Sequence, residues 1–384
     1  MPRKTNLKTQ LLKTLALNQV LSAEAINLIA EERKQYFYLR EILKDAVDER
    51  LIRKESVYEK TIKGSFTKQY YSITRKGMQK LICSSGDEWE TYVEMETRRN
   101  ADGIETEPLN SKQIHKLIRV NEARMISLRA GAKDGRQEND AFFFTDSPRV
   151  KQQILFQDTG DGKVNKIKDF DRCIFDGILD SKTRFLMMYS CCGVGKTWKK
   201  WNIAKDLNIA SFWNMTNSRF RYPVSTIYEE SFEGILLVKN HVQFTQLYKD
   251  VAEKRRRTEQ LGRGYKNFFA APLTWEGAEL VRFLMHTDLE EYDRMIAEYM
   301  SPKGYSHNTE YKPETYFLIS PDQHLTINGT YLEIRRMQRA EEVYSSGLGY
   351  IPEILCFEWQ VPFYKKTLPF SQLIVIPEKI LQER

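Results

Sequence analysis

The chain has 384 residues, of which 41% are hydrophobic and 29% charged, proportions ordinary for a globular protein of two or three domains. Its apolar runs, among them "ILLV" and the last four residues of "SQLIVI", are far shorter than a membrane span, and the basic N-terminus lacks the apolar stretch of a signal peptide. Five cysteines without CxxC spacing and five scattered histidines argue against a disulfide framework and a zinc site. We therefore expect a cytoplasmic protein with reduced thiols, no membrane partner and no metal ligands.

Positive charge is concentrated at the N-terminus. Residues 1–82 contain 17 Lys and Arg against 9 Asp and Glu, a net charge of +8. The whole chain carries +7, so the remaining 302 residues are nearly neutral. A basic segment on a neutral body predicts a module that binds a polyanion.

The pattern of residues 1–83 predicts three helices followed by a two-stranded hairpin. Apolar residues at helical spacing indicate helices over 7–18, 23–30 (with Ser22 as N-cap) and 34–50. "RLIRKESVY" then predicts a strand, "EKTIKGSFTK" a turn, and "QYYSITRKGMQKLI" a return strand and a helix capped by Thr74. This arrangement resembles winged helix-turn-helix domains, most closely in "YYSITRKGMQKL", where Thr74 and Gly77 fall at familiar positions.

In such a domain the third helix enters the major groove of double-stranded DNA and the hairpin, or wing, meets the flanking backbone. We predict that the helix supplies phosphate clamps and donors for base edges, from Arg33, Lys34, Gln35, Tyr36, Tyr38 and Arg40. Lys60, Lys63 and Lys68 of the wing are predicted to contact phosphates. The alternative is a winged helix that makes only protein contacts, with its lysines as a solvated face. The confinement of the positive charge to this segment favours DNA.

The remaining sequence predicts a linker and a second folded region. Residues 84–110 are acidic and turn-rich, typical of a linker, and 111–165 predict an amphipathic helix (111–132) and a loop. In 166–384, "RCIFDGILD" and "RFLMMYS" predict a hairpin, with further strands at "EGILLVKN" and "EILCFEWQVPF". Helices are expected at "HVQFTQLYKDVAEKRRR", "TWEGAELVRFLM" and "LEEYDRMIAEYM". The predicted fold class is α+β multidomain: a winged helix-turn-helix, then a mixed α/β domain with a mostly antiparallel or mixed sheet.

The stretch "YSCCGVGKTW" (189–198) is similar to a phosphate-binding P-loop. In that interpretation Gly195, Lys196 and Thr197 would bind ATP and Mg²⁺. Ser190 stands where the pattern requires its first glycine, and no nearby apolar strand ends in an acidic residue. The competing interpretation is a glycine turn after a strand. We favour the turn and expect no cofactor, with ATP and Mg²⁺ kept as the alternative.

No catalytic residues can be assigned from the sequence. Asp176 and the "ExQ" at 358–360 are only a faint likeness of a restriction-type nuclease pattern. A second basic cluster offers a further DNA contact or, equally, a solvated loop; it contains Lys254, Arg255, Arg256, Arg257 and Arg263.

The order of parts resembles the replication-relaxation family of Gram-positive plasmids and integrative conjugative elements. The likeness rests on the winged-helix pattern, the following "IHKLIRVNEA" helix and the α+β region, and it is clearest over residues 7–130. It implies DNA binding near a replication or transfer origin, a C-terminal domain shaped like a nuclease but lacking the acidic residues of nuclease active sites, and a strand and turn at 189–198. We therefore expect a DNA-binding protein of a mobile element, with replication or relaxosome proteins as partners and a homodimer as an assembly. The alternatives are a DNA-dependent P-loop NTPase and a transcriptional regulator with a C-terminal sensing or dimerisation domain.

Overall fold

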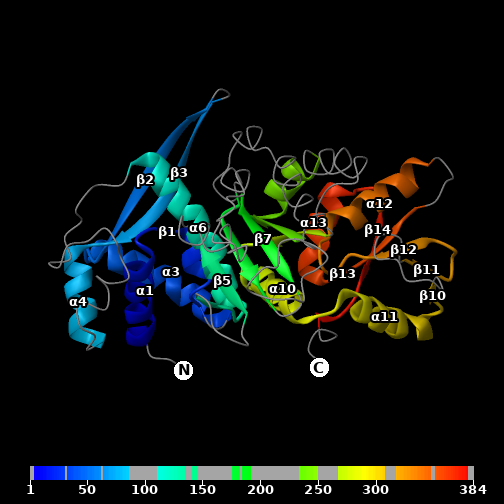
Figure 1. Cartoon of the computed structure of the whole chain (residues 1–384), viewed down its shortest axis with the longest axis horizontal. Helices are drawn as coiled ribbons and strands as arrows, with labels where there is room; N and C mark the ends of the chain where they lie inside the picture. Colours follow the sequence, from blue (N-terminus) through cyan, green and yellow to red (C-terminus); the bar gives the residue numbers. More distant parts are fainter. Residues whose placement is uncertain are drawn as a thin grey trace, which may run out of the picture.

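A computed structural model shows three β-sheets arranged one after another along the longest axis of the molecule, with helices packed around them (Figure 1). The fold is mixed α/β, and its sheets are antiparallel or mixed, in agreement with the predicted α+β class. The structure describes residues 4–30, 33–61, 64–85, 110–134, 141–145, 175–181, 184–191, 233–249, 267–307, 317–346 and 351–378.

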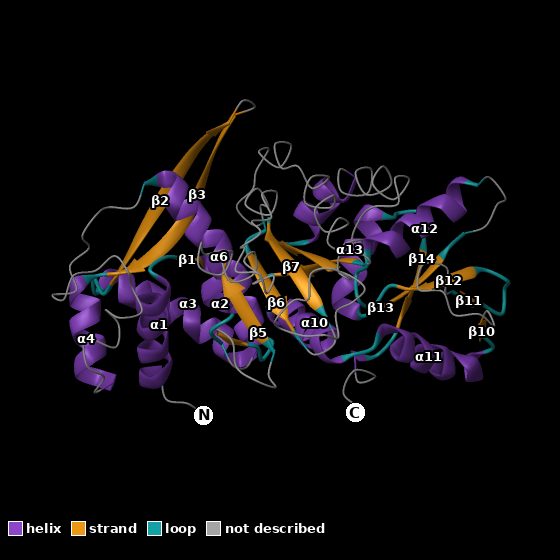
Figure 2. Ribbon diagram, in the orientation of Figure 1, coloured by secondary structure: helices purple, strands orange, loops and turns teal. Residues whose placement is uncertain are grey.

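The N-terminal unit contains helices and one antiparallel sheet. Its elements in chain order are α1 (Lys4–Asn18), β1 (Leu21–Ser22), α2 (Ala23–Asn27), α3 (Arg33–Asp48), β2 (Ile52–Thr61), β3 (Gly64–Ile73) and α4 (Arg75–Ser85). The strand order is β1-β3-β2, so the short β1 lies against the hairpin formed by β2 and β3. This hairpin projects from the rest of the molecule (Figure 2).

Two predicted N-caps of this unit are confirmed. The Ser22 hydroxyl accepts a hydrogen bond from the Ala25 N–H (3.3 Å), and Thr74 Oγ1 accepts one from the Gly77 N–H (3.1 Å). Each bond satisfies a backbone donor that the first turn of a helix leaves without a partner. The helix α3 ends because Arg50 adopts a left-handed conformation (φ 59°), which lets the Leu51 N–H bond to the Ala46 carbonyl (2.9 Å).

Helix α6 (Ser111–Arg129) connects the N-terminal unit to the central sheet. Asn110 and Gln113 form a capping box, each side chain accepting the other residue's backbone N–H at 3.0 Å. The helix contacts β1, β2 and α2 on one side and β5, β7 and α10 on the other. The segment predicted as a helical connector is therefore packed between two sheets.

The central sheet has the strand order β4-β5-β6-β7-β8-β9. Its strands and the helix that follows them are β4 (Lys133–Asp134), β5 (Phe142–Thr145), β6 (Gly177–Asp180), β7 (Phe185–Ser190), β8 (Glu233–Val238), β9 (Phe268–Pro272) and α10 (Trp275–His286). The predicted hairpin is confirmed, because β6 and β7 are antiparallel with Leu179 opposite Leu186. The strands β7, β8 and β9 are parallel and buried along their described length, which matches their continuous apolar sequences.

The C-terminal unit holds a third, five-stranded sheet. Its elements are α11 (Leu289–Met300), β10 (Ser306–His307), β11 (Leu318–Ile319), β12 (Leu325–Asn328), α12 (Ile334–Ser345), β13 (Glu353–Cys356), α13 (Val361–Thr367) and β14 (Gln372–Val375), with short 3₁₀ helices at Ser301–Lys303 and Glu358–Gln360. The buried Asp293 of α11 forms an ion pair with Arg336 of α12 and accepts a hydrogen bond from Asn328 (2.9 Å).

One predicted strand is shorter than expected. "EILCFEWQVPF" is a strand only as far as Cys356. The Gln360 side chain accepts the Phe357 N–H (2.9 Å) and Pro362 occupies the first turn of α13, so the chain turns into helix instead.

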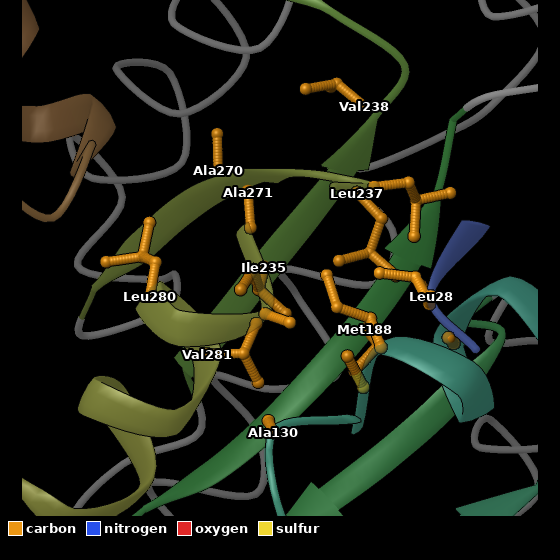
Figure 3. Close-up of a cluster of buried hydrophobic side chains, with 14 of the residues drawn as sticks. Leu28, Ala130, Met188, Ile235, Leu237, Val238, Ala270, Ala271, Leu280 and Val281 are labelled. Carbon is orange, nitrogen blue, oxygen red and sulfur yellow. The ribbon is translucent and has the colours of Figure 1, made fainter. Parts of the chain in front are cut away.

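The hydrophobic core runs through all three units. A single cluster of buried apolar residues includes Leu28 from the N-terminal unit, Met188 and Leu237 from the central sheet and Ile354 from the C-terminal sheet. Figure 3 shows Leu28 in the same cluster as the side chains of the central sheet. Within the described ranges, no helix is both long and apolar enough to cross a membrane.

Candidate nucleic-acid interface

Helix α3 has a buried face and an exposed face that diverge in chemistry. Gln35, Leu39, Ile42 and Ala46 point into the core of the N-terminal unit, at helical spacing. The opposite face is exposed and consists of Phe37, Arg40, Glu41 and Lys44, at positions i, i+3, i+4 and i+7. Its N-terminal half is aromatic and basic, whereas acidic residues begin at Glu41.

Tyr36 is held in place at the start of this face. Its hydroxyl accepts a hydrogen bond from an Arg40 terminal guanidinium nitrogen (2.9 Å) and a longer one from the Asn27 amide (3.4 Å). The Arg40 guanidinium also lies 4.9 Å from the centre of the Tyr36 ring, a cation–π distance. Helices α2 and α3 therefore share one small polar cluster, and Arg40 extends from it on the exposed side.

The β2–β3 hairpin also has two faces. Alternation along the strands puts Lys54, Ser56 and Tyr58 on one side, where all three are exposed, together with Thr67 and Gln69 of the facing strand. Tyr58 is 57% exposed. Lys54 is not among the residues predicted from the sequence to contact DNA. Strand alternation alone places it on this face, because Ser56 and Tyr58 follow it at intervals of two residues.

The other face of the hairpin packs against α6. Val57 and Tyr70 are buried against Ile118, with Ile114 and Leu117 beside them. Lys68 lies directly opposite Val57 and shares this buried face. The hairpin is therefore supported from behind along its base by a helix of the connecting segment.

Lys68 lies on the opposite face of the hairpin from the one that the sequence predicts. We expected residues 59–68 to form a turn with Lys68 facing solvent, but β2 and β3 remain paired as far as Thr61 and Gly64. Strand alternation then turns Lys68 toward α6, where it is 8% exposed and forms an ion pair with the buried Glu122. Its ammonium group is committed to this carboxylate, so we remove Lys68 from the residues expected to contact phosphate.

Glu122 belongs to a cluster that we call the ionic junction: Lys68, Arg119, Glu122, Asp176 and Ser190. All of them are buried except Arg119, whose side chain is 39% exposed. Glu122 accepts hydrogen bonds from Lys68 and from the Ser190 hydroxyl. Asp176 accepts the Ser190 N–H (2.9 Å) and forms an ion pair with Arg119 Nε (3.0 Å). The junction therefore links β3, α6 and β7, and its two cations offset its two carboxylates.

Burial and the charges of the ionic junction both affect the pKa of the Cys191 thiol. Complete burial, reinforced by the negative charges of Asp176 and Glu122, raises its pKa well above the ordinary value, against an opposing effect of Arg119. The thiol is therefore held in its neutral form.

Further bonds join the same two units around α6. The Asn121 amide donates to the carbonyls of Asn18 (2.8 Å), the last residue of α1, and Val20 (2.7 Å), which precedes β1. At the periphery, Lys239 after β8 forms an ion pair with Glu24 of α2 (2.7 Å). The N-terminal unit is thus attached to the central sheet by buried polar contacts as well as by the core.

The other predicted DNA contacts are distributed unevenly. Tyr38 and Arg40 are exposed on α3, but Gln35 is 7% exposed and faces the core, so it is not placed to reach a base edge. The side chains of Arg33, Lys34 and Lys60 lie outside the described part of the structure, as does Lys63. The second basic cluster of Lys254, Arg255, Arg256, Arg257 and Arg263 also falls outside it.

No known family model matches the chain, and comparisons with curated proteins and with solved structures found no match.

The beginning of the P-loop-like stretch is described, whereas Gly195, Lys196 and Thr197 lie outside the described residues. The Ser190 N–H donates to Asp176, and the Cys191 N–H donates to the Leu237 carbonyl (2.8 Å). A phosphate cradle uses backbone N–H groups of this kind. The N–H groups of Ser190 and Cys191 are bonded within the protein, and the carboxylates of Asp176 and Glu122 lie beside Ser190.

Within the described residues, no group of three or more His, Cys, Asp or Glu is placed to hold a metal ion.

Proposed function

We propose that the chain is a sequence-specific double-stranded DNA-binding protein whose N-terminal unit is a winged helix-turn-helix. The observation that carries the proposal is the element order α1-β1-α2-α3-β2-β3 with strand order β1-β3-β2, in the most basic part of the chain. In this arrangement α3 follows a short helix and precedes a projecting hairpin, the layout in which a winged helix presents one helix and one hairpin to a duplex.

In the proposed complex the N-terminal half of α3 enters the major groove. Arg40 is suited to a guanine or a phosphate, because a guanidinium has five N–H donors in a fixed fork. Tyr38 adds an exposed hydroxyl. The exposed face of the hairpin, with Lys54 and Tyr58, lies toward the neighbouring backbone. The acidic residues from Glu41 onward favour an orientation in which the C-terminal half of α3 turns away from the phosphates.

The resemblance to the replication-relaxation family supports a proposal for which DNA the chain binds and which proteins it acts with. We propose that the DNA is a replication or transfer origin of a mobile element, and that replication or relaxosome proteins are the partners. A homodimer would place two α3 helices on successive major grooves, so the target site would then contain two half-sites about one helical turn apart.

The nucleotide-binding alternative has less support. Ser190 stands where the P-loop pattern requires its first glycine, and its hydroxyl and N–H are bonded to Glu122 and Asp176. Lys196→Ala separates the two functions, because it would abolish ATP binding in an NTPase and leave DNA affinity unchanged in the proposed protein.

The test is the affinity of the full chain for a duplex selected from a random-sequence library, measured by fluorescence anisotropy at moderate salt. Reversing the charge of both Lys34 and Arg40 to Glu should reduce binding to the level of non-specific DNA. The matched control reverses Lys365 and Lys366 of α13, two exposed cations of the C-terminal unit. It changes the net charge equally and should preserve sequence-specific binding. Equal affinities of the wild type and the Lys34/Arg40 variant would contradict the proposal.

A further inference from the structure

Phe37 stands apart from the other apolar residues of the structure. Its side chain is 73% exposed, the largest value among the exposed large hydrophobic residues that the structure describes. It lies on the second turn of α3, on the same face as Arg40. Exposing an entire phenyl ring to water is unfavourable by about 2 kcal/mol relative to burying it, so a partner that covers it would gain that free energy.

The surroundings of Phe37 limit what this partner can be. On its own face the next residues are Arg40, Glu41 and Lys44, all charged and exposed. A protein-docking patch spans several hundred Å² of contiguous apolar surface, and Phe37 with the partly exposed Tyr38 (46%) beside these charges does not provide it. The net charge of +8 over residues 1–82 complements a polyanion instead.

A DNA duplex presents one apolar group to a helix in its major groove, the C5-methyl group of thymine. The ring of Phe37 is available for such a contact because most of it is exposed. It meets the ring of Tyr36 edge to face, with centroids 6.0 Å apart and planes at 85°, and Tyr36 is itself held by Arg40 and Asn27. An apolar side chain fixed beside a guanidinium can therefore distinguish a thymine from a cytosine next to a base that the guanidinium contacts.

We infer that Phe37 is a specificity-determining residue that packs against a thymine methyl group in the major groove. The inference rests on the proposed DNA binding and adds to it the identity of one base. It assigns the discrimination to an apolar contact rather than to a hydrogen bond, so removing only the methyl group must remove it.

The experiment replaces each thymidine of the selected duplex, one at a time, by deoxyuridine, which retains the base pair and loses only the C5-methyl group. For the wild-type full chain, one thymidine position for each bound α3 helix should lose about fourfold in affinity, the equivalent of one buried methyl group. Phe37→Ser should bind the thymidine and deoxyuridine duplexes equally at that position, and Phe37→Leu should keep part of the preference. Because the side chain is mostly exposed, these variants should fold normally.

Ile351→Ser is the matched control, since Ile351 is also exposed (44%) and lies before β13 in the C-terminal unit. It should keep the full methyl preference. A methyl preference that persists in Phe37→Ser, or no position that responds to deoxyuridine in the wild type, overturns the inference while DNA binding stands. A Phe37→Ser variant that changes the mass of the particle in solution instead would assign Phe37 to a protein contact. If the wild type selects no duplex at all, the proposed function itself fails.

Discussion

Gly77 shows how closely single residues of the N-terminal unit are constrained. It lies in α4 against the end of α3, and a Cβ atom at this position would be 2.1 Å from the backbone carbonyl oxygen of Leu51. That oxygen also accepts the Thr74 N–H (3.0 Å), so it cannot move away without breaking the connection between α4 and β2. Only glycine allows the two backbones to approach this closely.

We therefore expect Gly77→Ala to destabilise the protein although alanine favours helices. Overpacking against a backbone atom costs about 1–3 kcal/mol, and the gain in helix propensity offsets about 1 kcal/mol of this. Because a 2.1 Å approach to a backbone oxygen lies at the severe end of this range, urea denaturation should show a net loss of about 2 kcal/mol. Gln79→Ala, two residues later on the exposed side of α4, should leave the unfolding free energy nearly unchanged. An unchanged midpoint for Gly77→Ala would mean that α4 can shift away from Leu51.

The two faces of the β2–β3 hairpin have different roles, and a pair of lysines tests this. Lys68 is buried with Glu122, whereas Lys54 is exposed on the opposite face. Lys68→Met leaves the Glu122 carboxylate buried without its cation, which should cost about 3 kcal/mol of unfolding free energy. Lys54→Met should change stability by less than about 0.5 kcal/mol. Similar values for the two variants in denaturant titrations would show that the ionic junction does not stabilise the fold.

The contact between α2 and the end of β8 should make stability depend on pH. Burial, the largest single influence, raises the pKa of Glu24, but the hydrogen bond from Lys239 and the charges of Lys68 and Lys239 together bring it below the ordinary value. The folded state therefore favours the carboxylate. Its stabilising effect is complete above the ordinary pKa of 4.5 and is lost as the pH falls through the lower folded-state pKa.

Glu24→Gln removes this titration. The difference in unfolding free energy between wild type and variant should be largest at neutral pH and shrink below about pH 4.5. Thermal unfolding between pH 7 and pH 3 measures it. Lys239→Met should weaken the same pH dependence, because it removes the hydrogen bond that lowers the pKa. A difference that stays constant over this range would contradict the assignment.

The sequence predicts where helices and strands form better than it predicts which face of each one is buried. The caps at Ser22 and Thr74 and the β6–β7 hairpin follow from local patterns, because capping and strand alternation act within a few residues. The orientation of Lys68 could not be predicted in the same way. It depends on where the hairpin turn begins, and on a carboxylate 54 positions away in α6. Gln35 was misplaced for a similar reason, because the direction in which α3 packs is set by α1 and β2.

In the whole molecule, positive charge is concentrated in the N-terminal unit, and the proposed DNA binding depends on this. The basic unit with its projecting hairpin occupies one end of the molecule, and the nearly neutral central and C-terminal units extend from it (Figure 1). The continuous core and the ionic junction attach the two regions firmly. A duplex bound at the basic end would thus be presented in a fixed orientation to whatever binds the remaining surface.

The salt dependence of DNA affinity is the strongest test of the proposal that the N-terminal unit binds a duplex. Each phosphate neutralised by a lysine or arginine releases counterions, so the logarithm of the association constant should fall linearly with the logarithm of salt concentration, by about 0.9 per phosphate. Lys54→Met should reduce this slope by about one contact, because Lys54 lies on the exposed face of the hairpin. Lys68→Met, measured at a temperature where it remains folded, should leave the slope unchanged, because its ammonium is held by Glu122. Binding that does not respond to salt, or a slope that changes with Lys68 and not with Lys54, would contradict the account.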